Sequence, residues 1–401
     1  MVEADRFIPS WLHEPEPQRI ATLLGEGNCR FVGGAVRDSL LDLAVSDVDI
    51  ATPLLPEAAA GRLEEGGVKV VPTGLEHGTI TAIISGRQFE ITTLRHDVET
   101  FGRRARVAFH DDWEADAARR DFTINALYLS PGGTLYDFFG GRDDLKKGRV
   151  CFIGEPGERI REDALRILRF FRFHAHYGKG ELDPEGLKAC RADVHLIETL
   201  SPERVAAELK RLLAATDPLP TLRVMAESRI LAAILADPSN LEELQGLVRI
   251  EAAMGTCDVL RRLASLLSGG GEAVAKAASA LRLSNKEKSR LVSIAERDLA
   301  FKTGLNDTQL QVAIYRSGLQ AVEDTLIVNA GPGDIERLRA VLKSAREFEI
   351  PDFPVTGVDL TALGINEGPE LGNTLKELEK SWIDSGFELS RKALLEQLNP
   401  E

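Results

Sequence analysis

Two aspartates separated by one residue follow a pair of glycines, and this order of residue types can support metal-dependent chemistry on phosphates. Residues 31–38 read FVGGAVRD, and residues 46–50 read SDVDI. We expect Asp47 and Asp49 to lie on a strand, where residues i and i+2 point to the same face. Two carboxylates on one face repel each other unless a cation lies between them. The pair therefore predicts a site for Mg²⁺ ions that bridge a triphosphate and an attacking hydroxyl.

Gly33 and Gly34 stand between a predicted strand and a predicted helix. Glycine lets the backbone approach an anion closely, and the first N–H groups of a helix favour a phosphate. Arg37 adds a fixed positive charge. A glycine pair alone is usually a turn, and an Asp-x-Asp pair alone is often a solvated strand edge. Together, in this order and spacing, they predict a nucleotide site.

A site with two metal ions usually needs a further carboxylate. Glu90 lies in the next predicted hairpin, in the stretch FEITTLR of residues 89–95, and is the candidate for this catalytic role. A glutamate of an edge strand that faces water fits the same pattern equally well.

Residues 119–126 read RRDFTINA. Arg120 is suited to a phosphate and Asn125 to a ribose hydroxyl, because an amide both donates and accepts hydrogen bonds. On its own, however, an Arg–Asp pair is usually a surface ion pair.

Residues 161–166 read REDALR, which places Asp163 and Arg166 three residues apart on a predicted helix and hence on one face. An ion pair between them is one interpretation. The other is a base-reading edge, in which Asp163 accepts the exocyclic amino group of cytosine or adenine and Arg166 donates to the ring nitrogen. Uracil and guanine lack that combination, so such an edge would refuse them.

Short strand-like runs alternate with helical segments up to about residue 150, and the pattern is helical from about residue 155. We expect strands at residues 28–32, 45–51, 68–72, 79–85, 88–94 and 126–129. Residues 97–114 have no period and are predicted to be a mobile loop, whereas residues 159–176 show the spacing of one helix. The fold class is therefore α+β, with a mixed head followed by an all-helical remainder.

The chain has 401 residues and a net charge of −14, yet its basic residues are clustered. Residues 103–106, 119–120, 146–149 and 159–172 hold such clusters, which is compatible with RNA binding because binding depends on local charge. No signal peptide or membrane-spanning run is evident, so we expect a cytosolic protein without a membrane partner. The cysteines are far apart and are predicted to be buried free thiols: Cys29, Cys151, Cys190 and Cys257.

The motifs, in this order, resemble those of the class II tRNA nucleotidyltransferases, the CCA-adding family of the polymerase-β-like nucleotidyltransferase superfamily. The matching stretches are FVGGAVRD, SDVDIATP, HGTI, FEITTLR, RRDFTINAL, LYDFFGGRDDL and GERIREDALRILRFFRF. The resemblance implies a head (residues 1–150), a neck that binds the nucleobase (151–235), and a body and tail that bind tRNA (236–401). It implies that Asp47 and Asp49 bind Mg²⁺ and that a set of further residues binds the nucleotide: Gly33, Gly34, Arg37, Arg120, Asn125, Asp163, Arg166 and Arg169.

The activity implied by this resemblance is addition of CCA to the tRNA acceptor end from CTP and ATP, with release of pyrophosphate. Full CCA-adding members carry a basic-x-basic element, which Arg104-Ala105-Arg106 matches. Addition of A alone, or poly(A) polymerase activity, is the alternative within the same superfamily. An RNA-binding module that kept the fold without catalysis is an alternative from another class, and retention of both aspartates argues against it.

Overall fold

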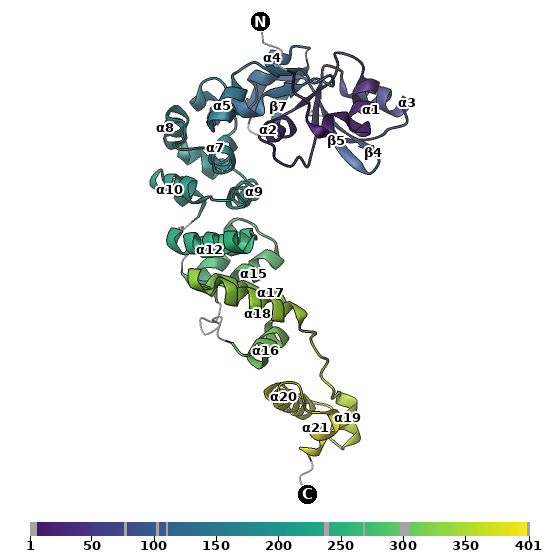
Figure 1. Cartoon of the computed structure of the whole chain (residues 1–401), viewed down its shortest axis with the longest axis vertical. Helices are drawn as coiled ribbons and strands as arrows, with labels where there is room; N and C mark the ends of the chain where they lie inside the picture. Colours follow the sequence, from purple (N-terminus) through teal and green to yellow (C-terminus); the bar gives the residue numbers. More distant parts are fainter. Residues whose placement is uncertain are drawn as a thin grey trace. The chain divides into compact units, whose positions relative to one another are not determined.

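The computed structural model describes residues 6–75, 78–101, 104–109, 111–235, 240–267, 269–296 and 305–398, with only the backbone described at 96–101 and 104–109. The chain divides into two compact units, Met1–Ala236 and Asp237–Glu401. Within the described residues, every strand lies in the first unit, in the purple to blue part of the ribbon (Figure 1). The predicted class, a mixed head followed by a helical remainder, is confirmed.

A seven-stranded mixed sheet forms the centre of the first unit, in the order β3-β4-β5-β2-β1-β8-β9. Only the central pair β2–β5 is parallel, and the other neighbours are antiparallel. The strands are β1 (Arg30–Val32), β2 (Asp49–Thr52), β3 (Lys69–Gly74), β4 (Thr79–Ile84), β5 (Arg87–Thr93), β8 (Leu127–Leu129) and β9 (Leu135–Asp137). All six expected strands are present, and β9 is an addition that the sequence did not indicate.

Asp47 does not lie on a strand, so the prediction of an i, i+2 pair on β2 is wrong. The strand begins at Asp49, which is opposite Val32 of β1. Beyond Val32 the β1 backbone turns at Gly33 into a helix. No β1 residue is left opposite Asp47, which therefore lies in the irregular segment that leads into β2.

The segment predicted to be a loop forms a two-stranded hairpin of β6 (Arg95–Phe101) and β7 (Arg104–Phe109). Its register shifts between Asp97 and Glu99. Such a bulge interrupts the alternation of side chains, which is why the sequence showed no period of two. The side chains of the basic-x-basic element at residues 104–106 lie outside the described part of the structure.

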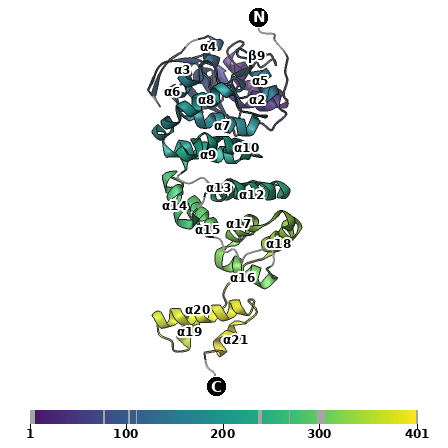
Figure 2. The ribbon, with the colours of Figure 1, turned by 90° about the vertical axis from the view of Figure 1, so that its left-hand side faces the viewer.

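The helix expected at residues 159–176 is two helices, α6 and α7, which is a further correction. Asp163 ends α6 in an extended conformation (φ −149°, ψ 104°), and α7 begins at Leu165. Figure 2 shows α7 stacked on α9 and α10, all within the first unit. The helices of this unit are α1 (Pro15–Leu24), α2 (Gly34–Leu40), α3 (Pro56–Glu65), α4 (Trp113–Ala118), α5 (Gly141–Lys147), α6 (Pro156–Glu162), α7 (Leu165–Tyr177), α8 (Pro184–Ala192), α9 (Pro202–Leu213), α10 (Leu219–Glu227) and α11 (Ile230–Ile234), with short 3-10 turns η1 (Ser10–His13), η3 (Thr123–Asn125) and η4 (Val194–Thr199).

A buried cluster beneath the sheet includes Val32, Ala51, Leu94 and Tyr128. Because β1, β2 and β8 all contribute to it, the ends of these strands are held by shared packing. Burial of the thiols is confirmed for Cys29 and Cys190 only, since Cys151 is half-buried and Cys257 is exposed. No helix in the described ranges is both long and apolar enough to cross a bilayer.

The second unit is helical throughout its described residues. One core packs α12, α16, α17 and α18 together, and a second core joins α19, α20 and α21. Its helices are α12 (Leu241–Met254), α13 (Val259–Leu266), α14 (Gly270–Ala280), α15 (Asn285–Ala295), α16 (Asp307–Ser317), α17 (Leu319–Asn329), α18 (Ile335–Glu347), α19 (Gly357–Ala362), α20 (Pro369–Asp384) and α21 (Arg391–Glu396), with the 3-10 turn η5 (Pro332–Asp334).

Candidate functional site

Three acidic side chains gather where β2 and β5 run side by side. The parallel register pairs Ile50 with Ile91, which sets Asp49 next to Glu90 in the sheet. Desolvation and the negative charges of Glu90 and Asp47 raise the pKa of Asp49, and Arg120 opposes this shift. Glu90 is therefore an electrostatic neighbour of Asp49, although both side chains remain exposed to solvent.

This acidic group has the chemistry of a divalent cation site. Carboxylate oxygens are the ligands that Mg²⁺ and similar hard cations prefer. A cation between these neighbouring carboxylates would offset the negative charge that Glu90 and Asp47 place near Asp49. Across the described residues, no three His, Cys, Asp or Glu side chains are already close enough to hold one ion. Among the residues that influence Asp49, Arg120 is the one that opposes the rise in its pKa.

The glycine turn lies between two guanidinium groups. Gly33 has φ +72° and ψ −126°, a conformation that a residue with a Cβ rarely adopts, and it precedes α2 directly. A Cβ on Gly33 would lie 3.7 Å from Nη1 of Arg120, and one on Gly34 would lie 3.7 Å from Nη2 of Arg37. An anion at this turn would therefore meet backbone and positive charge together.

Arg120 is held by residues that the sequence analysis did not single out. Its Nε donates to the Tyr128 hydroxyl at 3.0 Å, and its Nη2 donates to Asp116 Oδ2 at 3.3 Å. Asp116 is 1% exposed and also accepts from Arg119. Burial by itself would raise the pKa of Asp116, but the adjacent guanidinium groups of Arg120 and Arg119 outweigh it and lower that pKa. The i, i+4 spacing of Asp116, on α4, and Arg120, just after the end of that helix, is the pattern in the sequence that could have indicated this ion pair.

The Arg37 and Asn125 side chains contact each other. Arg37 Nη1 donates to Asn125 Oδ1 at 2.6 Å, and Asn125 Nδ2 donates to Asp121 Oδ1 at 2.9 Å. Arg37 also pairs with Asp38 and donates to the Tyr177 hydroxyl at 2.7 Å. Both Arg37 and Asn125 are 7% exposed, so the residues predicted to touch phosphate and ribose form a buried network instead of projecting freely.

Arg169, on α7, continues this network into the helical part of the first unit. Its Nε donates to Asp121 Oδ2 at 2.7 Å. Although burial opposes it, the negative charge of Asp121 raises the pKa of Arg169. The network thus connects α2, the turn at η3 and α7. Arg169 was predicted to contact a nucleotide, and in the structure its side chain contacts Asp121.

Asp163 and Arg166 are not paired with each other through their side chains in the structure. Asp163 accepts from the backbone N–H of Leu165 at 3.1 Å and from Arg204 Nη2 at 2.8 Å. Arg166 pairs with Glu162, and its Nη2 donates to the backbone oxygen of Arg119 at 3.2 Å. The predicted pair on one helix is thus replaced by two residues with separate partners.

Arginines of α6 and α7 donate to the backbone oxygens of Arg119 and Arg120. Arg159 of α6 donates to the backbone oxygen of Arg120 at 2.8 Å, next to the contact between Arg166 and Arg119. The arginines of α6 and α7 thus contact the backbone on either side of Arg120, whose own side chain borders the glycine turn and acts on Asp49 through its charge.

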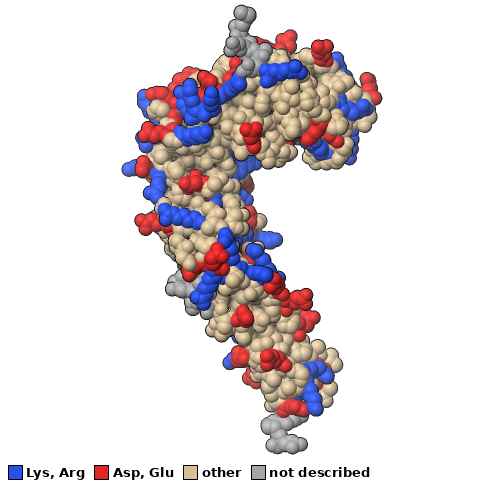
Figure 3. Space-filling view, in the orientation of Figure 1, with Lys and Arg blue, Asp and Glu red and all other residues tan. Residues whose placement is uncertain are grey.

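Lys and Arg side chains gather on the first unit in the region where Figure 1 shows α5 and α8 (Figure 3). Helix α5 alone contributes Arg142, Lys146 and Lys147, so one of the predicted basic clusters lies on the surface despite the acidic total charge. Asp143 on the same helix pairs with Lys147, and exposed lysines such as Lys146 are groups that suit the phosphates of a nucleic acid.

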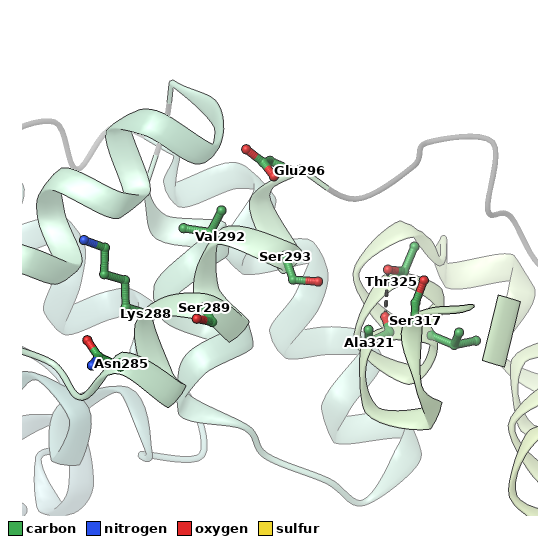
Figure 4. Close-up of a pocket in the computed structure, with 10 residues that line it drawn as sticks. Asn285, Lys288, Ser289, Val292, Ser293, Glu296, Ser317, Ala321 and Thr325 are labelled. Carbon is green, nitrogen blue, oxygen red and sulfur yellow. Dashed lines mark hydrogen bonds between the residues drawn. The ribbon is translucent and has the colours of Figure 1, made fainter. Parts of the chain in front are cut away.

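A different cavity, of about 720 Å³, lies in the second unit between α15 on one side and α17, with the last residue of α16, on the other. Figure 4 shows Ser289 and Ser293 on one side of it and Ser317 and Thr325 on the other. Among the described residues that line it, the charged ones are Lys288 and Glu296. In the described part of the lining there is one carboxylate and no arginine, which is a poor set of groups for a metal triphosphate.

Comparisons with known proteins show which families this chain resembles. A family model described as "Poly A polymerase head domain" matches residues 29–151, and one described as "Probable RNA and SrmB- binding site of polymerase A" matches residues 181–241. The human protein "CCA tRNA nucleotidyltransferase 1, mitochondrial" is 34% identical over 385 residues, which cover 91% of this chain and 85% of that protein. The "CCA-adding enzyme" of Limosilactobacillus fermentum is 31% identical over 377 residues, 91% of either chain.

Among solved structures, the Bacillus stearothermophilus CCA-adding enzyme in complex with CTP is similar over 96% of this chain and 98% of its own. The TM-score is 0.76 and the sequence identity 26%. The Thermotoga maritima CCA-adding enzyme complexed with tRNA shares the fold, with a TM-score of 0.67 and 21% identity.

Proposed function

This chain belongs to the CCA tRNA nucleotidyltransferase family, and we propose that it adds C, C and A to the 3′ end of tRNA from CTP and ATP, with release of pyrophosphate. The observation that carries the proposal is the acidic group around Asp49, next to a glycine turn bordered by Arg120 and Arg37. Metal-dependent transfer of a nucleotide needs these groups together: carboxylates for the cation, and cationic groups for the triphosphate.

In the proposed mechanism, Asp47 and Asp49 hold divalent cations, with Mg²⁺ as the proposed ion, and Glu90 is the candidate third carboxylate. Bound Mg²⁺ would help to deprotonate the tRNA 3′-hydroxyl and would offset the charge on the departing pyrophosphate. Gly33 and Gly34 leave room for the triphosphate beside the backbone, and Arg120 faces that space. The protein contributes mainly position and fixed charge, because phosphoryl transfer needs little covalent help.

Arg37, Asn125 and Arg169 act in this proposal as the frame of the nucleotide site. Their mutual contacts through Asp121 hold α2, η3 and α7 in one arrangement. Contact of Arg37 with phosphate and of Asn125 with ribose would require these side chains to exchange partners when the nucleotide binds.

Asp163 and Arg166 choose the base in this proposal. Asp163 would accept the amino group that cytosine and adenine share, and Arg166 would donate to the adjoining ring nitrogen. In the structure Arg166 pairs with Glu162 and donates to the backbone oxygens of Arg159 and Arg119. In this proposal, the N–H groups of Arg166 that are not used in these contacts would donate to the base.

The proposed domain assignment is a catalytic head at residues 1–150, a base-binding neck at 151–235, and a tRNA-binding body and tail at 236–401. Shape and phosphate contacts would dominate tRNA binding, since A-form RNA offers side chains little sequence to read. Cytosolic placement stays a prediction, because the human relative named above is mitochondrial.

The decisive experiment incubates the protein with tRNA that ends before, within or after CCA, with each NTP alone. CTP incorporation on the shortest tRNA, followed by ATP incorporation on tRNA that ends in CC, supports CCA addition. Use of ATP only on tRNA ending in CC would identify an A-adding enzyme instead. Long A tracts on unrelated RNA would identify a poly(A) polymerase, and failure to release pyrophosphate would favour a non-catalytic RNA-binding module.

A further inference from the structure

Helix α9 carries two charged residues one helical turn apart: Arg204 contacts the segment that holds Asp163, and Glu208 contacts α7. Arg204 Nη2 donates to Asp163 Oδ2 at 2.8 Å. Glu208 accepts from Arg172 Nε, on α7, at 2.6 Å. Residues i and i+4 share one face of a helix, so a single face of α9 supports both the link after α6 and the body of α7.

The Asp163 carboxylate is held from two sides. One oxygen accepts the backbone N–H of Leu165, and the other accepts Arg204. The Asp163 and Arg204 side chains are 32% and 28% exposed. An ion pair this exposed contributes little to stability, so its main effect is on where the carboxylate points. Each carboxylate oxygen can accept more than one hydrogen bond, which leaves Asp163 able to accept from a base.

Asp163 and Arg204 line the same cavity, which has a volume of about 260 Å³ and also includes Glu162 and Ser201. The carboxylate therefore borders open space and not tightly packed protein. If Arg204 were removed, no packed side chain on the cavity side would hold the Asp163 carboxylate in place.

Glu208 makes the position of Arg204 well defined. Glu208 is 3% exposed and also pairs with Arg211 at 3.2 Å, while Arg169 lies 4.0 Å away. Leaving a buried charge unpaired is costly, so the contact between Glu208 and Arg172 resists sliding of α9 along α7. Arg204 is thus carried by a helix whose register against α7 is set by a buried ion pair.

We propose that Arg204 is a positioning residue for nucleotide choice: it orients the Asp163 carboxylate so that cytosine and adenine are accepted and uracil is refused. The inference rests on the proposed function and deepens it. Arg204 need not touch the nucleotide. It acts by keeping an acceptor at a fixed place, because discrimination by hydrogen bonds is lost when the partner can move away.

The test measures kcat/KM for CTP and for UTP on tRNA that lacks CCA. Arg204→Gln should lower the CTP-to-UTP ratio about tenfold, mainly through CTP. Arg204→Lys, which keeps the charge and one donor, should restore part of the ratio. Lys69→Gln is the matched control, because it removes one exposed positive charge from the edge strand β3, and its ratio should equal that of the wild type.

A double-mutant cycle separates positioning from general damage to the site. Asp163→Asn should lower the ratio, and adding Arg204→Gln should lower it no further, because the two residues act through one contact. An equal fall for CTP and UTP, or an unchanged ratio, in Arg204→Gln would overturn the proposal. If Arg204→Gln melts at a lower temperature than the wild type, the CTP-to-UTP ratio is measured with Arg204→Lys instead. Wild-type protein that fails to extend tRNA would instead contradict the proposed function itself.

Discussion

The guanidinium of Arg37 donates to the amide oxygen of Asn125 at 2.6 Å, joining α2 to the turn at η3. The amide nitrogen of Asn125 in turn donates to Asp121, which pairs with Arg169 of α7. Three segments far apart in the sequence are thereby connected through one buried amide. The residues that looked like separate ligands for a nucleotide are, in this state, parts of one frame.

Replacing Asn125 by Leu should destabilise the first unit by about 1–3 kcal/mol, because Arg37 and Asp121 would each lose a buried partner. Urea unfolding followed by tryptophan fluorescence measures this change. A Trp382→Phe background limits the signal to Trp11 and Trp113, which lie in the first unit. Unchanged stability would show that the amide is dispensable to the frame.

Gly33→Ala should cost about 1–3 kcal/mol, because the backbone there has φ +72° and ψ −126°, a region that residues with a Cβ avoid. Its neighbour provides the matched control. Gly34→Ala lies at the start of α2, and its Cβ would meet only ordinary contact with Arg37. Gly34→Ala should leave the unfolding midpoint near that of the wild type. Equal effects of the two substitutions would argue against a special backbone at Gly33.

The lowered pKa of Asp116 predicts how the free energy of unfolding of the first unit depends on pH. Its pKa is lower in the folded chain than its ordinary value of 3.8, because Arg120 and Arg119 outweigh the effect of burial. A lowered native pKa means that the ion pairs stabilise the fold above about pH 4 and that this contribution is lost as the pH falls through the native pKa.

The measurement compares urea unfolding between acidic and neutral pH for the wild type and for Asp116→Asn. The variant should be less stable at neutral pH and should lose less stability on acidification. Asp111→Asn is the control, since Asp111 is an exposed carboxyl close in sequence. Parallel pH curves for the wild type and Asp116→Asn would rule out this role for Asp116.

Much of the sheet could be predicted from the sequence, because β-strand signals such as those of β4 and β5 are local. The place of Glu90 beside Asp49 could not, since it depends on the parallel register between β2 and β5. The break at Asp163 was also missed. The apolar spacing continues through that residue, while the Asp163 carboxylate accepts the N–H of Leu165 and favours a new helix start.

The supporting residues were the hardest to foresee. Arg204 is 41 positions from Asp163 in the chain, and nothing local links them. Such contacts follow from how α9 packs against α7, which is a property of tertiary structure. The motif residues themselves were recognisable because a nucleotide site needs particular residue types close together in the sequence.

Glu90→Gln should raise the Mg²⁺ concentration needed for half-maximal CTP incorporation several-fold, because removing one of three neighbouring carboxylates weakens a cation site. The activity at saturating Mg²⁺ should fall less. Glu64→Gln, on the exposed side of α3, is the control. An unchanged Mg²⁺ requirement would identify Glu90 as an exposed strand residue without a role in the metal site.

The central claim is that Asp47 and Asp49 form the metal site for nucleotide addition. The most direct measurement is CTP incorporation into tRNA lacking CCA by Asp47→Ala and Asp49→Ala proteins, with tRNA binding measured in parallel. Each substitution should abolish incorporation while tRNA binding stays close to that of the wild type. Incorporation at the wild-type rate by either variant would contradict the account.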